Sequence, residues 1–164
     1  MEMWDLYDKD KNMLERKVVR GEKLNKGEFH LVVNVWIEND KNELLVSQRA
    51  ANRTYPLQWE CTGGSALMGE TSIDAAIREA KEELGIDISK GESKYIGSTL
   101  RYYPNCDDIL EVWLFKINDA DKQEIVIQKE EVNDAKWLSR KEIRNLYDQG
   151  KFEANAFFNE VVGI

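Results

Sequence analysis

Hydrophobic and polar residues alternate over much of this chain with the period of two that is typical of β-strands. Runs rich in β-branched and aromatic residues, separated by short polar turns, strengthen this prediction. The predicted strands are residues 3–7, 13–19, 29–37, 43–48, 59–62, 94–101, 109–117 and 135–138. We expect 43–48 to pair with 29–37 across the polar turn between them, and we expect 50–57, which contains Pro56, to be a loop.

A longer period of three to four residues appears in 71–84 and predicts a helix. The apolar positions of this stretch are Ile73, Ile77, Ala80 and Leu84. Thr71 and Asp74 have the spacing of a capping box, in which each side chain bonds to the backbone of the other residue. Gly85 follows the last apolar position, where glycine commonly ends a helix.

Two further helices are predicted near the C-terminus. Ser139 and Glu142 form a second capping-box pattern, which opens a helix to about residue 147, and 152–162 is predicted as a final helix. Strands followed by single helices indicate an α/β or α+β fold with a mixed sheet. Because 164 residues is the length of one ordinary domain, we expect a single domain with an N-terminal strand or hairpin extension over about 1–27.

Charge and composition narrow the classes of function. The chain has 23 Lys and Arg residues against 31 Asp and Glu residues, so its formal net charge is −8. This acidic balance argues against binding to nucleic acid or to an anionic membrane surface. There is no signal-peptide pattern and no apolar window of membrane-spanning length, so we expect a cytoplasmic protein with reduced cysteines, Cys61 and Cys106. A homodimer is neither indicated nor excluded.

The first predicted helix carries a second, acidic face. Glu79, Glu82 and Glu83 stand at positions i, i+3 and i+4, so their carboxylates project along one side. A solvated surface is the simplest explanation of such a face, but a glycine-rich loop, 63–69, leads directly into the helix. Clustered carboxylates also hold Mg²⁺, which shares phosphate oxygens. The loop is not an NTPase phosphate loop, because Glu70 stands where that motif needs lysine.

Residues 64–86, GSALMGETSIDAAIREAKEELGI, fit the pattern G-x5-E-x7-R-E-U-x-E-E-x-G-U, in which U is a bulky aliphatic residue. The chain therefore resembles the Nudix hydrolase superfamily, and its one soft departure is Ala80, at a position that is usually larger. The resemblance implies an α/β/α sandwich with a mixed β-sheet that binds Mg²⁺ or Mn²⁺. It also implies a small-molecule substrate, a nucleoside diphosphate linked to another group X or another diphosphate, whose diphosphate linkage is hydrolysed.

The same resemblance assigns roles to residues in and next to 64–86, the segment that we call the Nudix box. The implied metal ligands are three glutamates and one backbone carbonyl: Glu79, Glu82, Glu83 and Gly63. Arg78 would orient the glutamates by ion pairing, and Glu70 would support the loop and the helix. Gly64 and Gly85 would permit the backbone geometry. The carboxylate that takes a proton from the attacking water is left open among three candidates: Glu79, Glu83 and Glu111.

Outside the box, the chain is similar to isopentenyl diphosphate isomerases and to isomerase-like Nudix hydrolases. The similarity involves 30–37, 43–50 and 137–139 and covers most of the chain. In the isomerases a catalytic cysteine stands seven residues before the first box glutamate, where this chain has Gly63. Cys61 comes two residues earlier, which in an extended segment displaces the thiol by roughly 6–7 Å. We therefore expect a hydrolase, with an isomerase and a nucleotide-binding sensor without turnover as alternatives.

Several residues outside the box are further candidates, each with a structural alternative. Arg49 and Arg53 follow a strand and suit bidentate phosphate contacts, although solvated loop arginines are about as common. Four aromatic residues are candidates to stack on a flat group or to be packing residues: Tyr55, Trp59, Tyr102 and Tyr103. Of these, Tyr102 is our candidate for substrate binding. His30 and Glu111 match functional positions of the isomerases. The structural alternatives are that His30 is a hydrogen-bonded structural residue and that Glu111 faces solvent.

Overall fold

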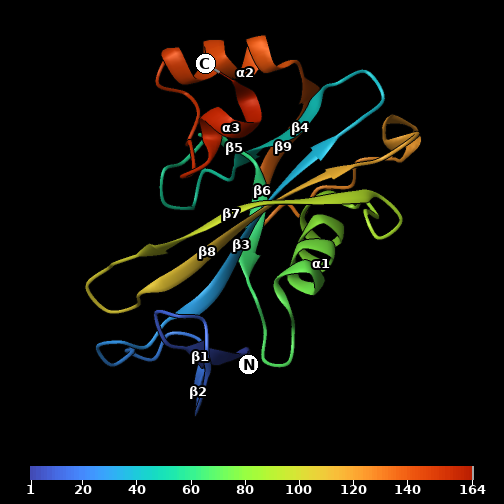
Figure 1. The fold of residues 1–164 in the computed structure, drawn as a ribbon. Helices are drawn as coiled ribbons and strands as arrows, with labels where there is room; N and C mark the ends of the chain where they lie inside the picture. Colours follow the sequence, from blue (N-terminus) through green and yellow to red (C-terminus); the bar gives the residue numbers. More distant parts are fainter. Residues whose placement is uncertain (164) are drawn as a thin grey trace.

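The computed structural model describes residues 1–163, apart from the side chain of residue 121, and contains two β-sheets and three α-helices within that range (Figure 1). The small sheet is the antiparallel pair β1 (Met3–Tyr7) and β2 (Met13–Val19). The large sheet consists of β3 (His30–Glu38), β4 (Leu44–Arg49), β5 (Trp59–Glu60), β6 (Thr62–Ser65), β7 (Glu92–Arg101), β8 (Asp108–Lys116) and β9 (Val132–Leu138). The helices are α1 (Ser72–Leu84), α2 (Arg140–Asp148) and α3 (Phe158–Val162), with a short 3-10 turn at Ala120–Lys122.

The large sheet is mixed, as the sequence predicts. Its strand order is β5-β4-β3-β8-β7, with β6 paired to β3 and β9 paired to β4. β3 and β8 are parallel over their whole length, whereas the other pairs are antiparallel. The predicted pairing of β4 with β3 occurs only at Glu38 and Leu44. Beyond that point β6 takes the place beside β3, and β4 pairs with β9 and β5.

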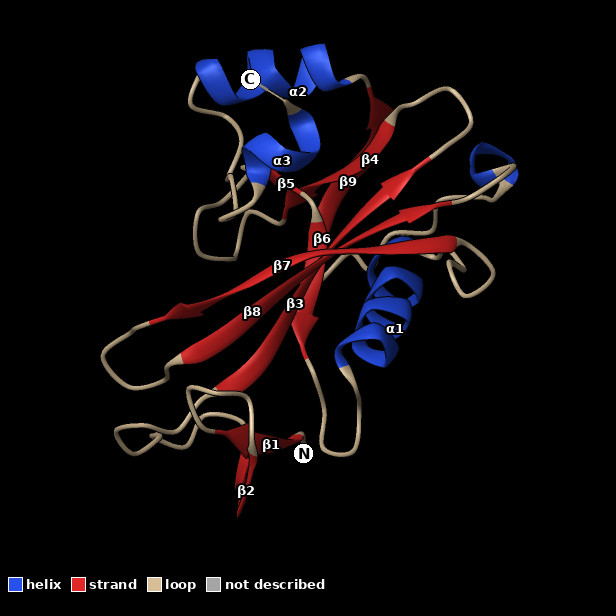
Figure 2. Cartoon of the chain, in the orientation of Figure 1, coloured by secondary structure: helices blue, strands red, loops and turns tan. Residues whose placement is uncertain are grey.

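Helices cover both faces of this sheet, which confirms the predicted α/β/α arrangement. Alternate residues of β3 point to opposite faces. One face packs on α1 through Val33, Val35, Ile37, Ala76, Ala80 and Leu84. The other packs on α2 and α3 through Trp36, Val112, Ile143, Phe158 and Val161. Figures 1 and 2 show α1 on one side of the sheet and the two C-terminal helices on the other.

The helix α1 begins and ends where its sequence signals lie. Thr71 is the N-cap, and both bonds of the capping box with Asp74 are present. Gly85 ends the helix in the left-handed conformation, with φ 72°, which costs glycine little because it has no Cβ. Ala80 is fully buried against the sheet, so the small residue at this position lies in a close helix-to-sheet contact.

Several element boundaries differ from those predicted, and the three largest differences are at β5 and β6, β9 and α3. The segment predicted as one strand over 59–62 is divided between β5 and β6, and β9 begins at Val132 instead of residue 135. The last helix is shorter than predicted and begins at Phe158. Phe152 instead makes a parallel bridge with Trp59 and stacks against Trp36 at 6.0 Å, so tertiary contacts hold this aromatic residue outside a helix.

The N-terminal hairpin, β1 and β2, has a small core of its own and is fastened to the glycine-rich loop. Its buried side chains are Trp4, Leu6, Val18 and Leu24. The Met68 N–H donates to the Met3 carbonyl over 2.8 Å, and the Gly69 N–H donates to Asp5 Oδ2 over 2.8 Å. The hairpin therefore contacts the loop that precedes α1. Among the described residues, no helix combines the length and the apolar character that crossing a membrane requires.

Candidate active site

An acidic cavity of about 260 Å³ lies between α1 and the backbone of β6. Glu79, Glu82 and Glu83 line it from the helix, and Gly63 and Gly64 line it from the strand. These five residues belong to the acidic face and the glycine pair that the sequence singled out. The helical spacing of the glutamates places their carboxylates on the side of α1 that borders the strand.

Arg78 holds the acidic face in place. Its Nε donates to Glu70 Oε2 over 2.8 Å, and one Nη donates to Glu70 Oε1 over 3.0 Å. The other Nη donates to Glu79 Oε1 at 3.0 Å and to Glu82 Oε2 at 3.1 Å. The Ser65 carbonyl accepts a further bond over 3.0 Å. The guanidinium thus joins the loop, the helix and two of the carboxylates, as expected of an orienting residue. The bond to Glu70 raises the pKa of Arg78 above its ordinary value.

Burial disfavours the ionised form of two of the three glutamates, Glu79 and Glu83. Burial is the largest of the causes that raise the pKa of Glu83 to about 7, and the neighbouring charge of Glu79 acts in the same direction. The Thr62 hydroxyl donates to Glu83 Oε2 over 2.6 Å and partly offsets this effect. Burial also raises the pKa of Glu79. Glu82 is half exposed. A cation in this cavity would therefore stabilise the ionised carboxylates.

Gly63 and Gly64 allow two close approaches. A Cβ at position 64 would lie 2.5 Å from Cδ of Glu79 and would overlap its carboxylate. A Cβ at position 63 would overlap the Val33 carbonyl oxygen and lie 2.6 Å from Asn34 Nδ2. Glycine at 64 therefore makes room for a carboxylate, and glycine at 63 makes room for the neighbouring strand.

Comparison with known proteins agrees with this geometry. The model of the family described as NUDIX domain matches residues 28–159. The chain belongs to the Nudix family. Its members are pyrophosphohydrolases that act on nucleoside diphosphates linked to another group, so the chain is an enzyme of this type, acting on acid anhydrides.

Individual relatives cover the chain to different extents. An uncharacterized Nudix hydrolase of Listeria monocytogenes is 35% identical over 166 residues, which cover all of this chain and 95% of that protein. An isopentenyl-diphosphate Delta-isomerase of Shigella boydii is 32% identical over 115 residues, which cover 66% of this chain and 61% of that protein. A crystal structure from Deinococcus radiodurans, 18% identical, covers 98% of this chain and 97% of its own with a TM-score of 0.73, which supports the fold.

The donor set of the Nudix box has the chemistry for a divalent cation. Nudix hydrolases generally use a divalent metal, and carboxylate and carbonyl oxygens are the ligands that Mg²⁺ and Mn²⁺ prefer. Within the described part of the chain, however, no three His, Cys, Asp or Glu side chains lie close enough together to hold an ion. Glu79 and Glu82 bond to Arg78, and Glu83 bonds to Thr62. Ligation by all three would require these carboxylates to turn toward one point.

A second cavity of about 390 Å³ adjoins the first and shares Gly63, Gly64, Glu83 and Arg53 with it. Arg49 lines this second cavity and is held by Glu60, with Nη–Oε distances of 3.0 and 3.1 Å. Arg53 pairs with Glu131. The structure therefore places both predicted arginines beside the Nudix box, and Arg53 faces both cavities.

Tyr102 does not line either cavity. It is 68% exposed and meets the edge of Phe29 at 5.8 Å between ring centroids. Its neighbour Tyr103 lines the second cavity together with Tyr55, which belongs to the loop after β4. Both tyrosines were among the stacking candidates, but the sequence analysis chose Tyr102 for substrate binding, and it is Tyr103 that lines the cavity. Two adjacent residues outside a regular strand have no fixed facing, so the sequence held no signal for choosing between them.

Glu111 lies on the α1 face of β8 but outside the acidic cavity. Its Oε2 accepts hydrogen bonds from Lys11 Nζ over 3.1 Å and from the Tyr95 hydroxyl over 2.9 Å. It lines a separate cavity with Thr71 and Ser72, next to the first turn of α1. The structure does not bring Glu111 together with the box glutamates.

His30 is buried beneath the N-terminal hairpin. Its ring stacks on Trp4 with the centroids 4.0 Å apart and the planes 6° from parallel, and Nε2 lies 4.0 Å from Asp108 Oδ2. Burial, together with the charges of Arg101 and Arg20, lowers the pKa of His30 to about 4. His30 lines neither the acidic cavity nor the adjoining one, and its contacts are those of a packing residue.

The position of the isomerase cysteine is occupied by Gly63, and Cys61 does not replace it. The Cys61 side chain is buried, and Asn155 Nδ2 lies 3.4 Å from its Sγ. Burial raises the pKa of Cys61, whereas a nucleophilic thiol needs a lowered pKa. These features disfavour the isomerase alternative.

Four polar residues from outside the Nudix box line the acidic cavity and were not predicted from the sequence: Glu2, Arg20, Gln128 and Glu131. Gln128 and Glu131 come from the segment before β9. The Gln128 N–H donates to the Glu83 carbonyl over 3.0 Å, and the Val126 N–H donates to the Leu84 carbonyl over 2.9 Å. This segment thus caps the C-terminal carbonyls of α1, and no local sequence pattern signals such a contact.

Proposed function

We propose that the protein is a Mg²⁺- or Mn²⁺-dependent hydrolase that cleaves the diphosphate linkage of a nucleoside diphosphate linked to a group X, by attack of water at phosphorus. The observation that carries this proposal is the position of Glu79, Glu82 and Glu83 along one cavity, next to Gly63 and Gly64. Burial disfavours two of these carboxylates as free anions, so divalent cation binding would relieve an existing cost.

Glu79, Glu82, Glu83 and the Gly63 carbonyl would hold the metal. When bound, the metal supplies charge neutralisation to the diphosphate and lowers the pKa of water. Arg78 keeps Glu79 and Glu82 on the cavity side of the helix through its bonds to both. The strongly paired Glu70 in turn fixes Arg78, so that Glu79 and Glu82 are held beside the cavity before substrate binds.

A carboxylate facing the cavity would take the proton of the attacking water. Glu79 and Glu83 remain the two candidates, because both line the acidic cavity. Glu111 stays a candidate only if it moves, since its carboxylate is bonded to Lys11 and Tyr95 in another cavity. The rate of a Glu111→Gln variant measures this directly, and we expect it to retain most of the parent activity.

Substrate would extend from the acidic cavity into the adjoining one. Arg53 lines both cavities and would bind phosphate oxygens, with Arg49 behind it. Group X or the nucleoside would lie in the larger cavity, where Tyr55 and Tyr103 offer aromatic surfaces. Tyr102 would contribute only after a movement of its turn.

The proposal is tested with purified protein and a panel of nucleoside diphosphate derivatives. We expect Mg²⁺- or Mn²⁺-dependent release of phosphate-containing products, and no release in excess EDTA. Glu82→Gln and Glu83→Gln should each lower kcat by about 100-fold or more, which is typical of removing one preorganised charged group. Glu92→Gln, a change of an exposed glutamate at the start of β7, is the matched control.

The same panel separates the alternatives. Conversion of isopentenyl diphosphate without phosphate release would indicate the isomerase, and binding of nucleotides without turnover would indicate a sensor. Equal rates for the parent and both box variants would show that the metal-site assignment is wrong.

A further inference from the structure

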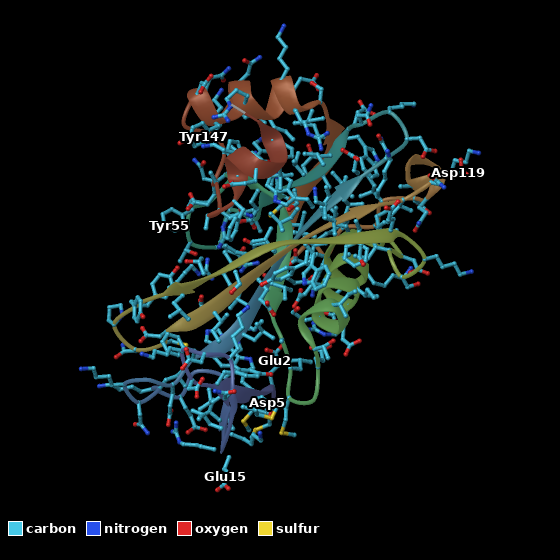
Figure 3. The ribbon with its side chains drawn as sticks, in the orientation of Figure 1. Glu2, Asp5, Glu15, Tyr55, Asp119 and Tyr147 are labelled. Carbon is cyan, nitrogen blue, oxygen red and sulfur yellow. The ribbon has the colours of Figure 1, made fainter. Side chains whose placement is uncertain are left out.

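The N-terminal hairpin reaches the acidic cavity. Glu2 and Arg20 line this cavity with the box glutamates, although both precede residues 28–159, where the Nudix model matches. The charge of Glu2 also raises the pKa of Glu79. Figure 3 shows Glu2 beside the loop that connects β6 to α1.

Arg20 is held in place by its own hairpin. It directly follows β2, and its N–H donates to the Glu2 carbonyl over 2.9 Å. Its guanidinium donates to Glu2 Oε2 over 2.8 Å and lies 5.9 Å from the Trp4 ring centroid. Trp4 in turn stacks on His30 of β3. The guanidinium therefore rests on a ring that is fixed to the large sheet.

The hairpin is also attached to the Nudix box itself. Asp5 Oδ2 accepts from the Gly69 N–H, and Asp5 Oδ1 lies 2.6 Å from Lys17 Nζ. With the bond from Met68 to Met3, these contacts join the hairpin to the loop that opens α1. The hairpin that positions Arg20 is thus joined to the box through Asp5 and Met3, and to the large sheet through Trp4.

The acidic cavity contains arginines as well as carboxylates, and Arg20 is one of them. Five carboxylates line it, from Glu2, Glu79, Glu82, Glu83 and Glu131. Two guanidiniums line it, from Arg20 and Arg53, and each is paired with a carboxylate at the rim. A diphosphate is a polyanion, and arginine binds phosphate oxygens in bidentate fashion. Both arginines are pre-positioned by carboxylates that are partly exposed and can be released to water.

We propose that the N-terminal hairpin completes the phosphate-binding site and that Arg20 binds phosphate oxygens of the substrate together with Arg53. On substrate binding, the guanidinium of Arg20 exchanges the Glu2 carboxylate for a phosphate group. This inference rests on the proposed diphosphate substrate, but it assigns a role to a segment outside the matched domain.

The first test compares Arg20→Gln, Arg20→Lys and the parent in steady-state hydrolysis. We expect KM of Arg20→Gln to rise by about threefold to tenfold, with kcat within about twofold, because removing a binding contact made equally in ground and transition states changes KM alone. Arg20→Lys, which keeps the charge, should recover part of the loss. The control is Arg16→Gln, since Arg16 pairs with Glu22 and Glu28 and does not line the cavity. An unchanged KM in folded Arg20→Gln would overturn the proposal.

The second test uses the parent protein. It does not depend on the folding of a variant or on hydrolysis of a substrate. Arginine side-chain ¹⁵Nε resonances are recorded with Mg²⁺ before and after addition of pyrophosphate. We expect the Arg20 resonance to shift and the Arg16 resonance to stay. A shift at Arg20 without hydrolysis of any substrate would contradict the proposed function and support the hairpin site. Pyrophosphate binding or normal hydrolysis with an unshifted Arg20 would overturn the hairpin site alone.

Discussion

The carboxylate of Glu79 occupies the space where a side chain at Gly64 would begin. A Cβ at position 64 would stand 2.5 Å from Cδ of Glu79, well inside van der Waals contact. The neighbouring glycine serves a different purpose, because a Cβ at 63 would meet the backbone of β3 at the Val33 carbonyl as well as the Asn34 side chain. Glycine at 64 is therefore required by the site, and glycine at 63 is required by the packing of the strands.

Replacing Gly64 by alanine should therefore impair activity more than stability. The added methyl group would displace the Glu79 carboxylate, which is the end of a flexible side chain and can move at little cost. We expect kcat/KM to fall by about 100-fold, because misplacement of a reacting group by about 1 Å costs on that order. Steady-state kinetics and thermal unfolding of the same preparation provide the measurement.

Gly63→Ala should differ from Gly64→Ala in its clear loss of stability. The Val33 carbonyl belongs to the central strand and cannot move away, so we expect the free energy of unfolding to fall by about 1–3 kcal/mol. A Gly64→Ala variant with full activity would show that the position of Glu79 is not needed for the reaction.

Arg78 should not be replaceable by lysine. A lysine cannot make the paired contact with Glu70 and also bond to Glu79 and Glu82, because an ammonium group lacks the planar fork. We expect Arg78→Lys to lose about 1–3 kcal/mol of unfolding free energy and at least about tenfold in rate. Denaturant unfolding and hydrolysis assays measure both. Lys81→Gln, an exposed change on the same helix, should leave both values near those of the parent.

His30 should make stability depend on pH in the acid range. Its folded-state pKa of about 4 lies below the ordinary 6.5, so the unfolded chain binds a proton where the folded protein does not. The free energy of unfolding therefore falls as pH falls from about 6.5, and His30 accounts for a loss of about 3 kcal/mol by pH 4. The groups facing it are Asp108, Arg101 and Arg20.

The contribution of His30 is isolated by subtracting the pH dependence of a His30→Gln variant from that of the parent. Both series are measured by urea unfolding between pH 4 and pH 8. A constant difference between the two proteins across this range would contradict a depressed pKa for His30.

Glu83 should have the opposite effect in metal-free protein. Burial raises its folded-state pKa to about 7, above the ordinary 4.5, so stability is present at low pH and is lost as pH rises from about 4.5 through 7. In EDTA at pH 8, Glu83→Gln should unfold with a free energy up to about 3 kcal/mol higher than the parent, since the neutral amide can still accept from Thr62.

Addition of Mg²⁺ should reverse the order of these two proteins. The metal stabilises the folded parent by binding it, whereas the variant lacks one ligand. Glu82→Gln is a useful comparison, because its 52% exposed side chain carries little burial cost and the metal-free stability should be nearly unchanged. A parent that is more stable than Glu83→Gln in EDTA at pH 8 would contradict the raised pKa.

The sequence by itself determined the local features of the fold and the core of the site. The turn of a helix sets the direction of side chains three and four residues apart, so the facing of Glu79, Glu82 and Glu83 followed from spacing alone. The capping box at Thr71 and the left-handed Gly85 are also local, because their bonds join residues within one turn. Strand periodicity placed β1 and β2 to the residue.

Tertiary structure alone decided which distant residues meet at that site. Arg20 comes to the box through a hairpin anchored at Gly69, and Glu131 comes through a segment that caps α1. The register of β8 carries Glu111 to Lys11, and the stacking of Trp4 buries His30. Such contacts depend on strand order and packing between segments far apart in the chain, and neither leaves a periodic pattern in the sequence.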